Sequence, residues 1–472
     1  MITFFLSLLA LIAGYMLYGK FVEHVFGPDS RPTPALLRAD GVDFIPMPLW
    51  KIFMIQFLNI AGTGPIFGAI MGAKFGPSAY LWIVLGCIFA GATHDYLAGM
   101  LSLRNDGIGL PEIIGKYLGN RAKKIMLVFS VLLLVMVGAV FVYSPAIVLG
   151  GMVGSVAIWI VVIFVYYVIA TMMPIDKIIG KIYPLFAFAL LFMAGAMLIG
   201  LIVKMPQLPE IWDGIGNQNP KMGPIVPILF ITIACGAISG FHATQSPLMA
   251  RCMKHEKLGR PIFYGAMITE GIVALIWATI SSYFFFGGGA EDVGAELSAS
   301  APQIVNIISE NWLGTLGGLL ALLGVVAAPI TSGDTALRSA RLIIADFIHL
   351  GQKTIRNRLL ICIPMFLVTM LILWFNIADE DGFNVIWNYF GWANQALSIF
   401  TLWAITVYLV QQRKPFIITL IPALFMTFVC TTFLLISPIA FGLNAWLSYG
   451  IGGCVLIVAL AWFYSWYRKN SH

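Results

Sequence analysis

The sequence predicts an all-α polytopic membrane protein of about thirteen transmembrane helices, built on a five-plus-five inverted repeat with extra helices at both ends. Three observations predict this fold. Of the 472 residues, 60% are hydrophobic and only 10% are charged, whereas a soluble globular chain carries about 25% charged residues. Nearly all Lys and Arg residues fall in alternate loops between apolar runs. Two apolar runs, five apart, are interrupted by Gly and Pro.

The apolar runs are long enough to be membrane spans, because a spanning helix needs about 20 mostly apolar residues. No long soluble domain remains between them. The N-terminal run lacks the basic start and the small-residue cleavage site of a secretory signal, so we expect a permanent first span. The predicted spans are residues 2–22, 51–74, 77–103, 122–144, 155–173, 182–204, 223–241, 261–286, 312–335, 358–377, 383–411, 415–436 and 443–467.

Basic residues are placed on one side of this topology. All but three of the 27 Lys and Arg residues follow odd-numbered spans, and the exceptions are Lys74, Lys204 and Lys221. Cytoplasmic loops carry the excess of basic residues, so we expect the N-terminus outside and the C-terminus in the cytoplasm. A miscount of one span would have mixed the two sets of loops, so the distribution also supports thirteen spans.

Spans 2 and 7 are predicted to be discontinuous. Each holds two glycines near a proline, within Asn59–Gly68 and within Ala234–Pro247. Proline removes a backbone donor and disfavours helix in the preceding residue, and glycine tolerates irregular dihedrals. Backbone groups freed inside a membrane must be buried in protein or line a cavity. Two packing kinks are the alternative interpretation.

The two breaks define the repeats. Spans 2–6 (residues 51–204) and spans 7–11 (residues 223–411) form the two halves, and an odd repeat length forces opposite orientations. Residues 1–22 add one helix before them, and residues 415–472 add two helices and a short tail. Paired discontinuous helices in inverted repeats are a recurring design of transporters, with substrate bound between the half-helix ends.

The breaks and their surroundings supply the candidate substrate ligands. Half-helix N-termini carry partial positive charge and free N–H groups, which suit a carboxylate. The two amides of span 11 either contact substrate or join helices by hydrogen bonds. The candidate residues are Gly62, Thr63, Gly64, Ser239, His242, Thr244, Gln245, Asn394 and Gln395.

Few ionisable residues lie inside the spans, and charge there costs several kcal/mol or is neutralised by a pKa shift. His94 and Asp95 in span 3 are therefore predicted to carry the coupling proton, with a structural pair joining neighbouring helices as the alternative. Adjacent helical residues point about 100° apart, so the two side chains need not touch. Glu270 in span 8 is weaker evidence, because an ion pair with a loop Arg also explains it.

Coupling to Na⁺ instead of H⁺ has one candidate site. Thr331 and Ser332 in span 9 offer two hydroxyl ligands, which would complete a cation site with carbonyls of the span 2 break. A helix end, with Asp334 capping a basic helix over residues 335–347, is the alternative. No cofactor and no firm metal site is predicted, and the absence of a phosphate-binding loop motif excludes ATP hydrolysis by that mechanism.

Several motifs resemble the carbon starvation protein A family, over most of residues 45–400. The resemblance implies a leucine-transporter-type fold in a bacterial inner-membrane uptake system, associated with pyruvate–proton symport or with peptide use in starvation. After the shared Phe241-His242, the stretch Ala243–Pro247 departs from the family pattern. The motifs are Ala61–Ile70, Gly76-Pro77, Trp82, Phe89–Asp95, Ser239–His242, Asp334 with Arg338-Ser-Ala-Arg341, and Gly391–Gln395.

The expected function is therefore secondary active import of pyruvate or a related carboxylate by proton symport. Peptide uptake is the closest alternative. A channel, a sensor or an enzyme acting on lipid-linked substrates is the alternative of another class, although the loops lack the clustered acids or histidines of such an enzyme. The expected partners are a small-molecule substrate and the lipid bilayer, with no nucleic acid, and the oligomeric state is left open.

Overall fold

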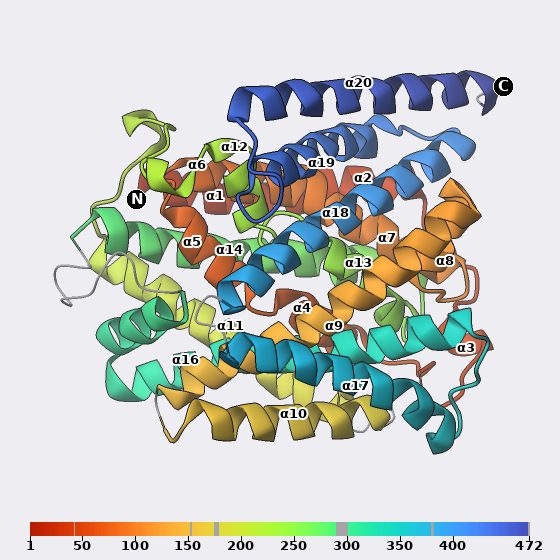
Figure 1. Ribbon diagram of the computed structural model, residues 1–472, viewed down its shortest axis with the longest axis horizontal. Helices are drawn as coiled ribbons and strands as arrows, with labels where there is room; N and C mark the ends of the chain where they lie inside the picture. Colours follow the sequence, from red (N-terminus) through yellow and green to blue (C-terminus); the bar gives the residue numbers. More distant parts are fainter. Residues whose placement is uncertain (42, 152, 174–178, 289–300, 379–381, 471–472) are drawn as a thin grey trace.

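The protein is a bundle of helices in the computed structural model, which describes residues 1–41, 43–151, 153–173, 179–288, 301–378 and 382–470 (Figure 1). No β-strand occurs in these ranges. The α-helices are α1 (Ile2–Ala13), α2 (Gly19–Phe26), α3 (Pro34–Leu37), α4 (Leu49–Ala61), α5 (Ala69–Ala73), α6 (Ser78–Leu81), α7 (Ala92–Arg104), α8 (Leu110–Leu118), α9 (Asn120–Gly150), α10 (Val156–Met172), α11 (Ile179–Lys204), α12 (Ile225–Thr232), α13 (Gly240–Ala250), α14 (Gly265–Phe286), α16 (Ala301–Phe347), α17 (Ile355–Ala378), α18 (Gly382–Gln411), α19 (Ile417–Ile436) and α20 (Ala445–Asn470).

Short π-helical and 3₁₀ segments join some of these helices into longer rods. The π-helical segments are Gly14–Tyr18, Gly64–Gly68, Trp82–Gly91 and Arg260–Tyr264, and the 3₁₀ turns are Ile211–Asp213, Pro220–Met222 and Glu256–Leu258.

Nine helices in the described part of the chain are long and apolar enough to cross a membrane. The bent pair α4–α5, with its π-helical link, makes a tenth. Helix α10 is apolar but has only 17 residues, and α12 and α13 are separated by a break. The chain is thus a multi-pass membrane protein, as predicted, and the total of thirteen spans stays a prediction.

Helix α16 corrects one expectation. This element of 47 residues has one residue with non-helical dihedrals, Gly314 (φ 65°, ψ −174°). The helix continues through Pro329 and Asp334 to Phe347. The expected helix end, capped by Asp334, is therefore wrong. The Asp334 carboxylate instead accepts hydrogen bonds from the hydroxyls of Tyr183 (2.7 Å) and Tyr166 (3.3 Å) on neighbouring helices. Both bonds end on Oδ2, and Oδ1 finds no hydrogen-bond partner among the described residues.

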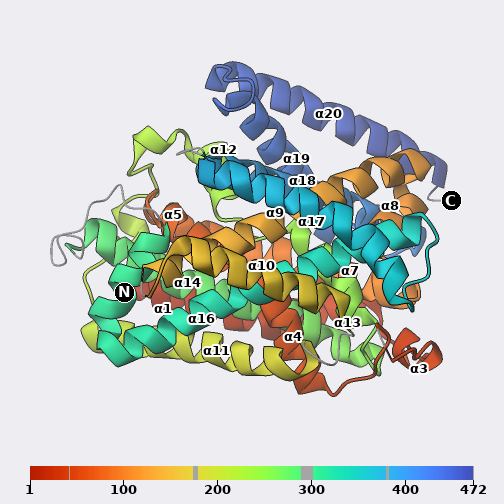
Figure 2. The same ribbon diagram turned by 60° about the horizontal axis from the view of Figure 1, so that its bottom comes forward.

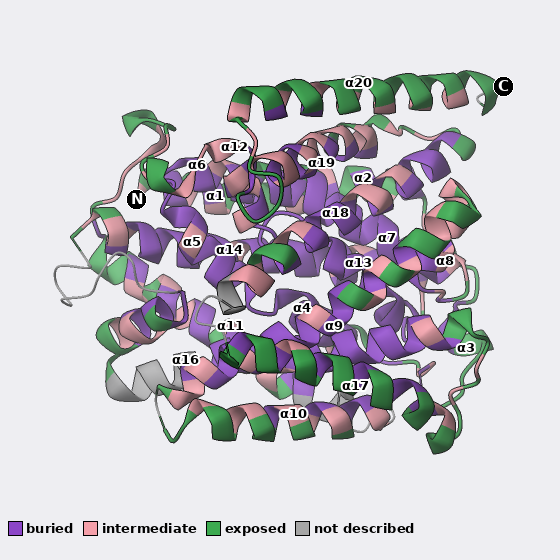
Figure 3. Ribbon diagram, viewed as in Figure 1, coloured by how far each residue is buried: buried purple, intermediate pink, exposed green. Residues whose placement is uncertain are grey.

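The burial pattern is that of a membrane protein. Every residue of α13, at the centre, is buried, whereas α20 buries only Ser448 and Gly452 (Figure 3). In two views α20 lies outside the bundle against α19 (Figures 1 and 2). Its Trp446 and Trp462 side chains are 81% and 77% exposed. Such apolar exposure is costly in water and favourable in lipid, so the outer helices form the lipid-facing layer.

The two termini lie at opposite ends of the bundle (Figure 1). The C-terminus shares its end with α3 and α8, and the N-terminus shares the other end with α5 and α12. We call the first of these the basic end, because the loops that carry most Lys and Arg residues connect there.

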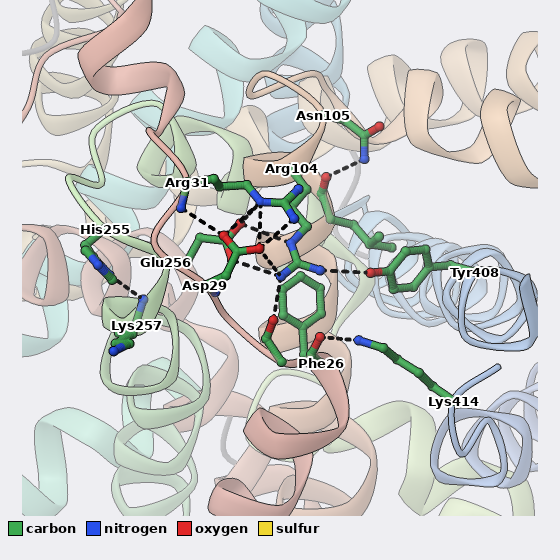
Figure 4. Close-up of polar contacts among 12 residues, drawn as sticks. Phe26, Asp29, Arg31, Arg104, Asn105, His255, Glu256, Lys257, Tyr408 and Lys414 are labelled. Atoms are coloured by element: carbon green, nitrogen blue, oxygen red, sulfur yellow. Dashed lines mark hydrogen bonds and ion pairs between the residues drawn. The ribbon is translucent and has the colours of Figure 1, made fainter. Parts of the chain in front are cut away.

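Ion pairs join separate helices at the basic end (Figure 4). Arg104, at the end of α7, donates to the buried Glu256 carboxylate through Nε (3.0 Å) and Nη2 (2.9 Å). Its guanidinium lies 4.0 Å from the Phe26 ring centre and donates to the Gly27 carbonyl at 2.6 Å. Lys414, after α18, donates to the Phe26 carbonyl. One network therefore joins the end of α2, the end of α7, the turn Glu256–Leu258 and the connection between α18 and α19.

Substituting Glu256 by Ala is expected to lower the free energy of unfolding by roughly 3 kcal/mol, because Arg104, only 14% exposed, loses its hydrogen-bonded carboxylate and keeps only Asp29, 3.9 Å away. Thermal unfolding of the purified protein measures the change. The matched control is Asp106→Asn, which removes a pair with Arg38 whose side chains are 53% and 55% exposed. That control should cost less than about 1 kcal/mol, and equal losses in the two variants would contradict the structural role of Glu256.

Candidate functional site

The first predicted break is present in the second span. Helix α4 ends at Ala61 and the chain resumes helical geometry at Gly64, with a bend of 53° between the halves. Gly62, between them, adopts φ 47° and ψ −147°, a conformation that L side chains rarely adopt. A Cβ there would also lie 2.7 Å from the Phe141 ring. Glycine is thus required at this position by backbone conformation and by space.

Ser332 of α16 holds the broken ends of this span. Its hydroxyl donates to the Leu58 carbonyl (2.6 Å) and accepts from the Gly62 amide (3.1 Å). The neighbouring Thr331 hydroxyl instead bonds to carbonyls of its own helix, Ala327 (3.0 Å) and Ala328 (2.8 Å). Of the two predicted cation ligands, only Ser332 therefore touches the break in this conformation.

The second break separates α12 from α13, over residues 233–239. It is shorter than the stretch suspected from sequence, because Pro247 lies inside α13. The two breaks touch each other, since a Cβ on Gly64 would lie 2.4 Å from the Cys235 side chain and one on Gly68 would lie 2.8 Å from the Thr232 carbonyl. The structure therefore brings together the two segments that the sequence singles out.

Asn394 of α18 occupies the N-terminus of α13. Its Oδ1 accepts from the Phe241 amide (2.7 Å) and the Ser239 hydroxyl (2.9 Å). The neighbouring Gln395 donates through Nε2 to the Phe230 carbonyl of α12 at 3.2 Å. In this conformation both amides of α18 therefore join helices, which is one of the two roles that the sequence leaves open.

The remaining polar residues of α13 bond mainly within their own helix. The Thr244 hydroxyl donates to the Phe241 carbonyl (2.6 Å), and Gln245 Nε2 donates to the Thr244 hydroxyl (2.9 Å). Gln245 also reaches α16, because its Oε1 accepts from Ser339 at 3.5 Å. These side chains are buried, so they are available to a ligand only when α13 moves away from its neighbours.

Four ionisable side chains form a continuous buried chain behind the second break. Asp95 Oδ1 lies 2.8 Å from His94 Nδ1, and Asp95 Oδ2 lies 2.7 Å from His242 Nδ1. His242 Nε2 lies 3.5 Å from the Glu270 carboxylate. All four side chains have no exposed surface. The sequence singled out His94, Asp95 and His242, and the structure connects them across α7 and α13.

Glu270 is the residue that sequence reasoning undervalued. From the sequence, an ion pair with a loop Arg also explained this acid. In the structure its carboxylate lies beside His242. A signal was present in the sequence: the positions three and four residues away on α14 are Ala266, Met267, Val273 and Ala274, which offer no charged partner on that helix. An acid on such a helix needs a partner from another helix.

The Glu270 region also holds a set of potential metal ligands. Donor atoms of Cys235, His242 and Glu270 lie within 4.8 Å of one another. Sulfur, imidazole nitrogen and carboxylate oxygen are the ligand types that transition metals take in proteins. The same atoms also suit protons, since His242 Nε2 and both Glu270 oxygens lack a hydrogen-bond partner among the described residues.

Two polar residues on α4, Gln56 and Asn59, were also missed, close to the predicted ligand Thr63. Gln56, Asn59 and Thr63 have no exposed surface, and their side-chain polar atoms find no hydrogen-bond partner in the described part of the chain. Gln56 and Asn59 are three residues apart, which places them on one face of α4 leading to the break, and Thr63 lies in the break itself. That spacing, in an otherwise apolar span, is the signal that would have revealed them. Buried unpartnered amides are costly, so these groups are suited to a ligand.

Comparisons with known proteins show the family of this chain. The family described as "Carbon starvation protein CstA" matches residues 1–149, 145–310 and 287–433. An uncharacterized membrane protein of Haemophilus influenzae is 45% identical over 60% of this chain and 91% of its own length.

Two relatives with assigned transport activities are more distant. The peptide transporter CstA of Campylobacter jejuni is 31% identical over 62% of this chain and 52% of its own length. The pyruvate/proton symporter BtsT of Escherichia coli is 25% identical over 74% of this chain and 58% of its own length. The chain therefore spans little more than half the length of these two transporters.

Solved structures share the fold at low sequence identity. A manganese transporter of Eremococcus coleocola, in complex with an aromatic bis-isothiourea substituted compound, superposes with a TM-score of 0.60 at 13% identity, covering 92% of this chain and 99% of that one. A Na⁺-coupled sialic acid symporter gives 0.57 at 14% identity, covering 97% and 96%. These likenesses confirm the predicted leucine-transporter type of fold.

Proposed function

Because the chain belongs to the carbon starvation protein CstA family, we propose that it imports pyruvate or a related small carboxylate with H⁺ across the bacterial cytoplasmic membrane. The family and its relatives are transporters, not enzymes. In the proposed orientation the basic end faces the cytoplasm, because loops rich in Lys and Arg are retained there.

The buried chain of His94, Asp95, His242 and Glu270 is the observation that supports proton coupling. Two carboxylates and two imidazoles hold different numbers of protons at little change in geometry, because Asp95 shares a hydrogen bond with each histidine and Glu270 lies 3.5 Å from His242. Closure of the protein around this cluster favours the state with least net charge, since an isolated charge is costly away from water. Closure on one side therefore takes up a proton, and opening on the other side releases it.

Substrate recognition is assigned to the first break. Gln56, Asn59 and Thr63 supply donors that have no hydrogen-bond partner among the described residues, beside the half-helix that starts at Gly64, and such a helix N-terminus favours a carboxylate. In the present conformation Gly64 packs on Cys235, so the two breaks must separate to admit substrate. Peptide uptake is the second candidate, favoured by the 31% identity to a peptide transporter. A peptide presents the same carboxylate but needs a larger cavity.

The proposal predicts pyruvate uptake into proteoliposomes that is driven by an imposed pH gradient and abolished by a protonophore. One pH unit is worth about 1.4 kcal/mol, so one H⁺ per substrate supports about tenfold accumulation. Unlabelled dipeptides in excess should leave uptake unchanged, and competition by them would favour the peptide candidate. Uptake that follows a Na⁺ gradient and ignores pH would move the coupling to Ser332. No gradient-driven pyruvate uptake at all would overturn the proposal.

A further inference from the structure

Two arginines on α16 are buried without adequate partners. Arg338 and Arg341 have no exposed surface. Arg338 Nη2 donates to the carbonyls of Ala170 and Met173, both at 2.7 Å, but its Nε and Nη1 find no hydrogen-bond partner among the described residues. All three guanidinium nitrogens of Arg341 also lack a hydrogen-bond partner among the described residues. Burial of a guanidinium without hydrogen bonds is costly, so this pair is suited to an anion.

Asp43 is the one carboxylate in the described residues that forms an ion pair with these arginines, and it fits them poorly. Its Oδ1 lies 3.7 Å from Arg338 Nη1 and 3.8 Å from Arg341 Nη2. Both distances exceed the 2.7–2.9 Å of a charge-assisted hydrogen bond. Asp43 comes from the connection between α2 and α4, where its amide bonds to Asp40 at 3.0 Å. It is therefore a tethered carboxylate near the arginines, without the two-pronged geometry that a guanidinium prefers.

The other charged side chains that the structure describes nearby do not neutralise the pair. Arg358 interacts electrostatically with Arg341 and adds a third positive charge. Its own guanidinium is occupied by the carbonyls of Met172 and Gln352, each at 2.7 Å. Asp334, one turn from Arg338, is engaged by tyrosine hydroxyls. Among the residues that the structure describes, three buried positive charges thus face two carboxylates, so their charges sum to one net positive charge.

The position of the arginines links the transport site to the basic end. Ser332 touches the first break, and Arg341 lies nine residues further along the same helix, about 14 Å at the α-helical rise. Ser339, between the two arginines, contacts Gln245 of α13 at 3.5 Å. On the other side, Asp43 lines two cavities of about 360 and 620 Å³ at the basic end. Asp43 therefore lies between the arginine pair and these cavities.

We propose that Arg338 and Arg341 form a second anion site, which takes the carboxylate of substrate leaving the first break, and that Asp43 occupies this site as a tethered competitor in the present conformation. The choice of substrate rests on the proposed function. A guanidinium pair binds a planar carboxylate through two parallel N–H···O bonds, and displacement by Asp43 then releases the substrate towards the basic end. Inorganic phosphate offers the same oxyanion chemistry from the cytoplasm, so the experiment must separate the two sources.

Anion-dependent thermal stabilisation of the purified full-length protein tests the site without requiring transport. Acetate, pyruvate and inorganic phosphate are titrated separately at constant ionic strength set with chloride. Asp43→Asn is expected to lower the carboxylate concentration for half-maximal stabilisation at least tenfold, because a tethered competitor acts at millimolar effective concentration. Arg341→Gln should lose the acetate effect, and Arg341→Lys should weaken it. The control Arg38→Gln, an exposed arginine paired with Asp106, should behave as wild type.

Transport kinetics then connect the site to substrate release. In vesicles of opposite orientation, Arg341→Gln should raise the pyruvate KM at the basic end at least tenfold and leave the KM at the other end within twofold. Unchanged acetate stabilisation in both Arg341→Gln and Asp43→Asn would overturn the anion site, and if Arg341→Gln does not fold, Asp43→Asn decides alone. Stabilisation by phosphate but not by acetate or pyruvate would overturn the carboxylate assignment. Anion stabilisation without any pyruvate transport would refute the proposed function and leave the anion site standing.

Discussion

Asp95→Asn is expected to abolish accumulation of substrate against a gradient while sparing exchange of labelled for unlabelled substrate. In the wild type the two carboxylate oxygens of Asp95 lie 2.8 Å from His94 and 2.7 Å from His242. Asparagine keeps the shape of aspartate and can still bond to both histidines. It cannot take up or release a proton. With a gradient of one pH unit, the wild type should reach about tenfold accumulation for one H⁺ per substrate, and the variant should only equilibrate.

The matched control for this experiment is Thr269→Val. Thr269 precedes Glu270 on α14, but its hydroxyl donates to the Gly265 carbonyl of its own helix at 2.9 Å, so accumulation should be unchanged. Normal accumulation by Asp95→Asn would return Asp95 to a purely structural role joining α7 and α13. Loss of exchange together with accumulation, in a protein that still folds, would show that Asp95 binds substrate or maintains the site instead of carrying the proton.

The breaks could be predicted because their causes are local. A glycine and a proline close together in an apolar span, such as Gly62 and Pro65, predict an interruption of the helix. The structure bends there by 53°. The second break was located less well, because Pro247 is accommodated inside α13 and the chain unwinds at residues 233–239 instead. Which weak point unwinds depends on partners from elsewhere, here Asn394 at the N-terminus of α13. Such partners are not visible along the chain.

Members of the buried cluster could be singled out from the sequence, but their contacts with one another could not. Buried ionisable residues are rare enough in apolar spans to be noticed individually, which is why His94, Asp95 and His242 were singled out. Asp95 and His242 are 147 residues apart in sequence, however, and only the packing of α7 on α13 brings them within 2.7 Å. The same limit explains Asp334, which was expected at a helix end but is engaged by Tyr183 of another helix.

Gly240→Ala is expected to cost more than the roughly 1–3 kcal/mol typical of overpacking and to abolish transport. Gly240 is the first residue of α13, and a Cβ there would lie 2.4 Å from both the Asn394 carbonyl oxygen and the Ser398 amide nitrogen. These are backbone atoms of α18, so relief requires moving one helix away from the other. That movement breaks the bond between the Phe241 amide and Asn394, and it displaces His242 from Asp95.

Thermal unfolding of the purified variant, together with pyruvate exchange in proteoliposomes, measures both expected losses. Gly195→Ala on α11 is the matched control, since no atom lies within 4 Å of a Cβ built there. Alanine is favoured over glycine inside a helix by about 1 kcal/mol, so the control should be neutral or slightly stabilising. If Gly240→Ala unfolds and transports like the wild type, α13 and α18 must separate at little cost. The close contact at Gly240 would then not be needed for transport. The requirement that this contact holds His242 against Asp95 would be wrong.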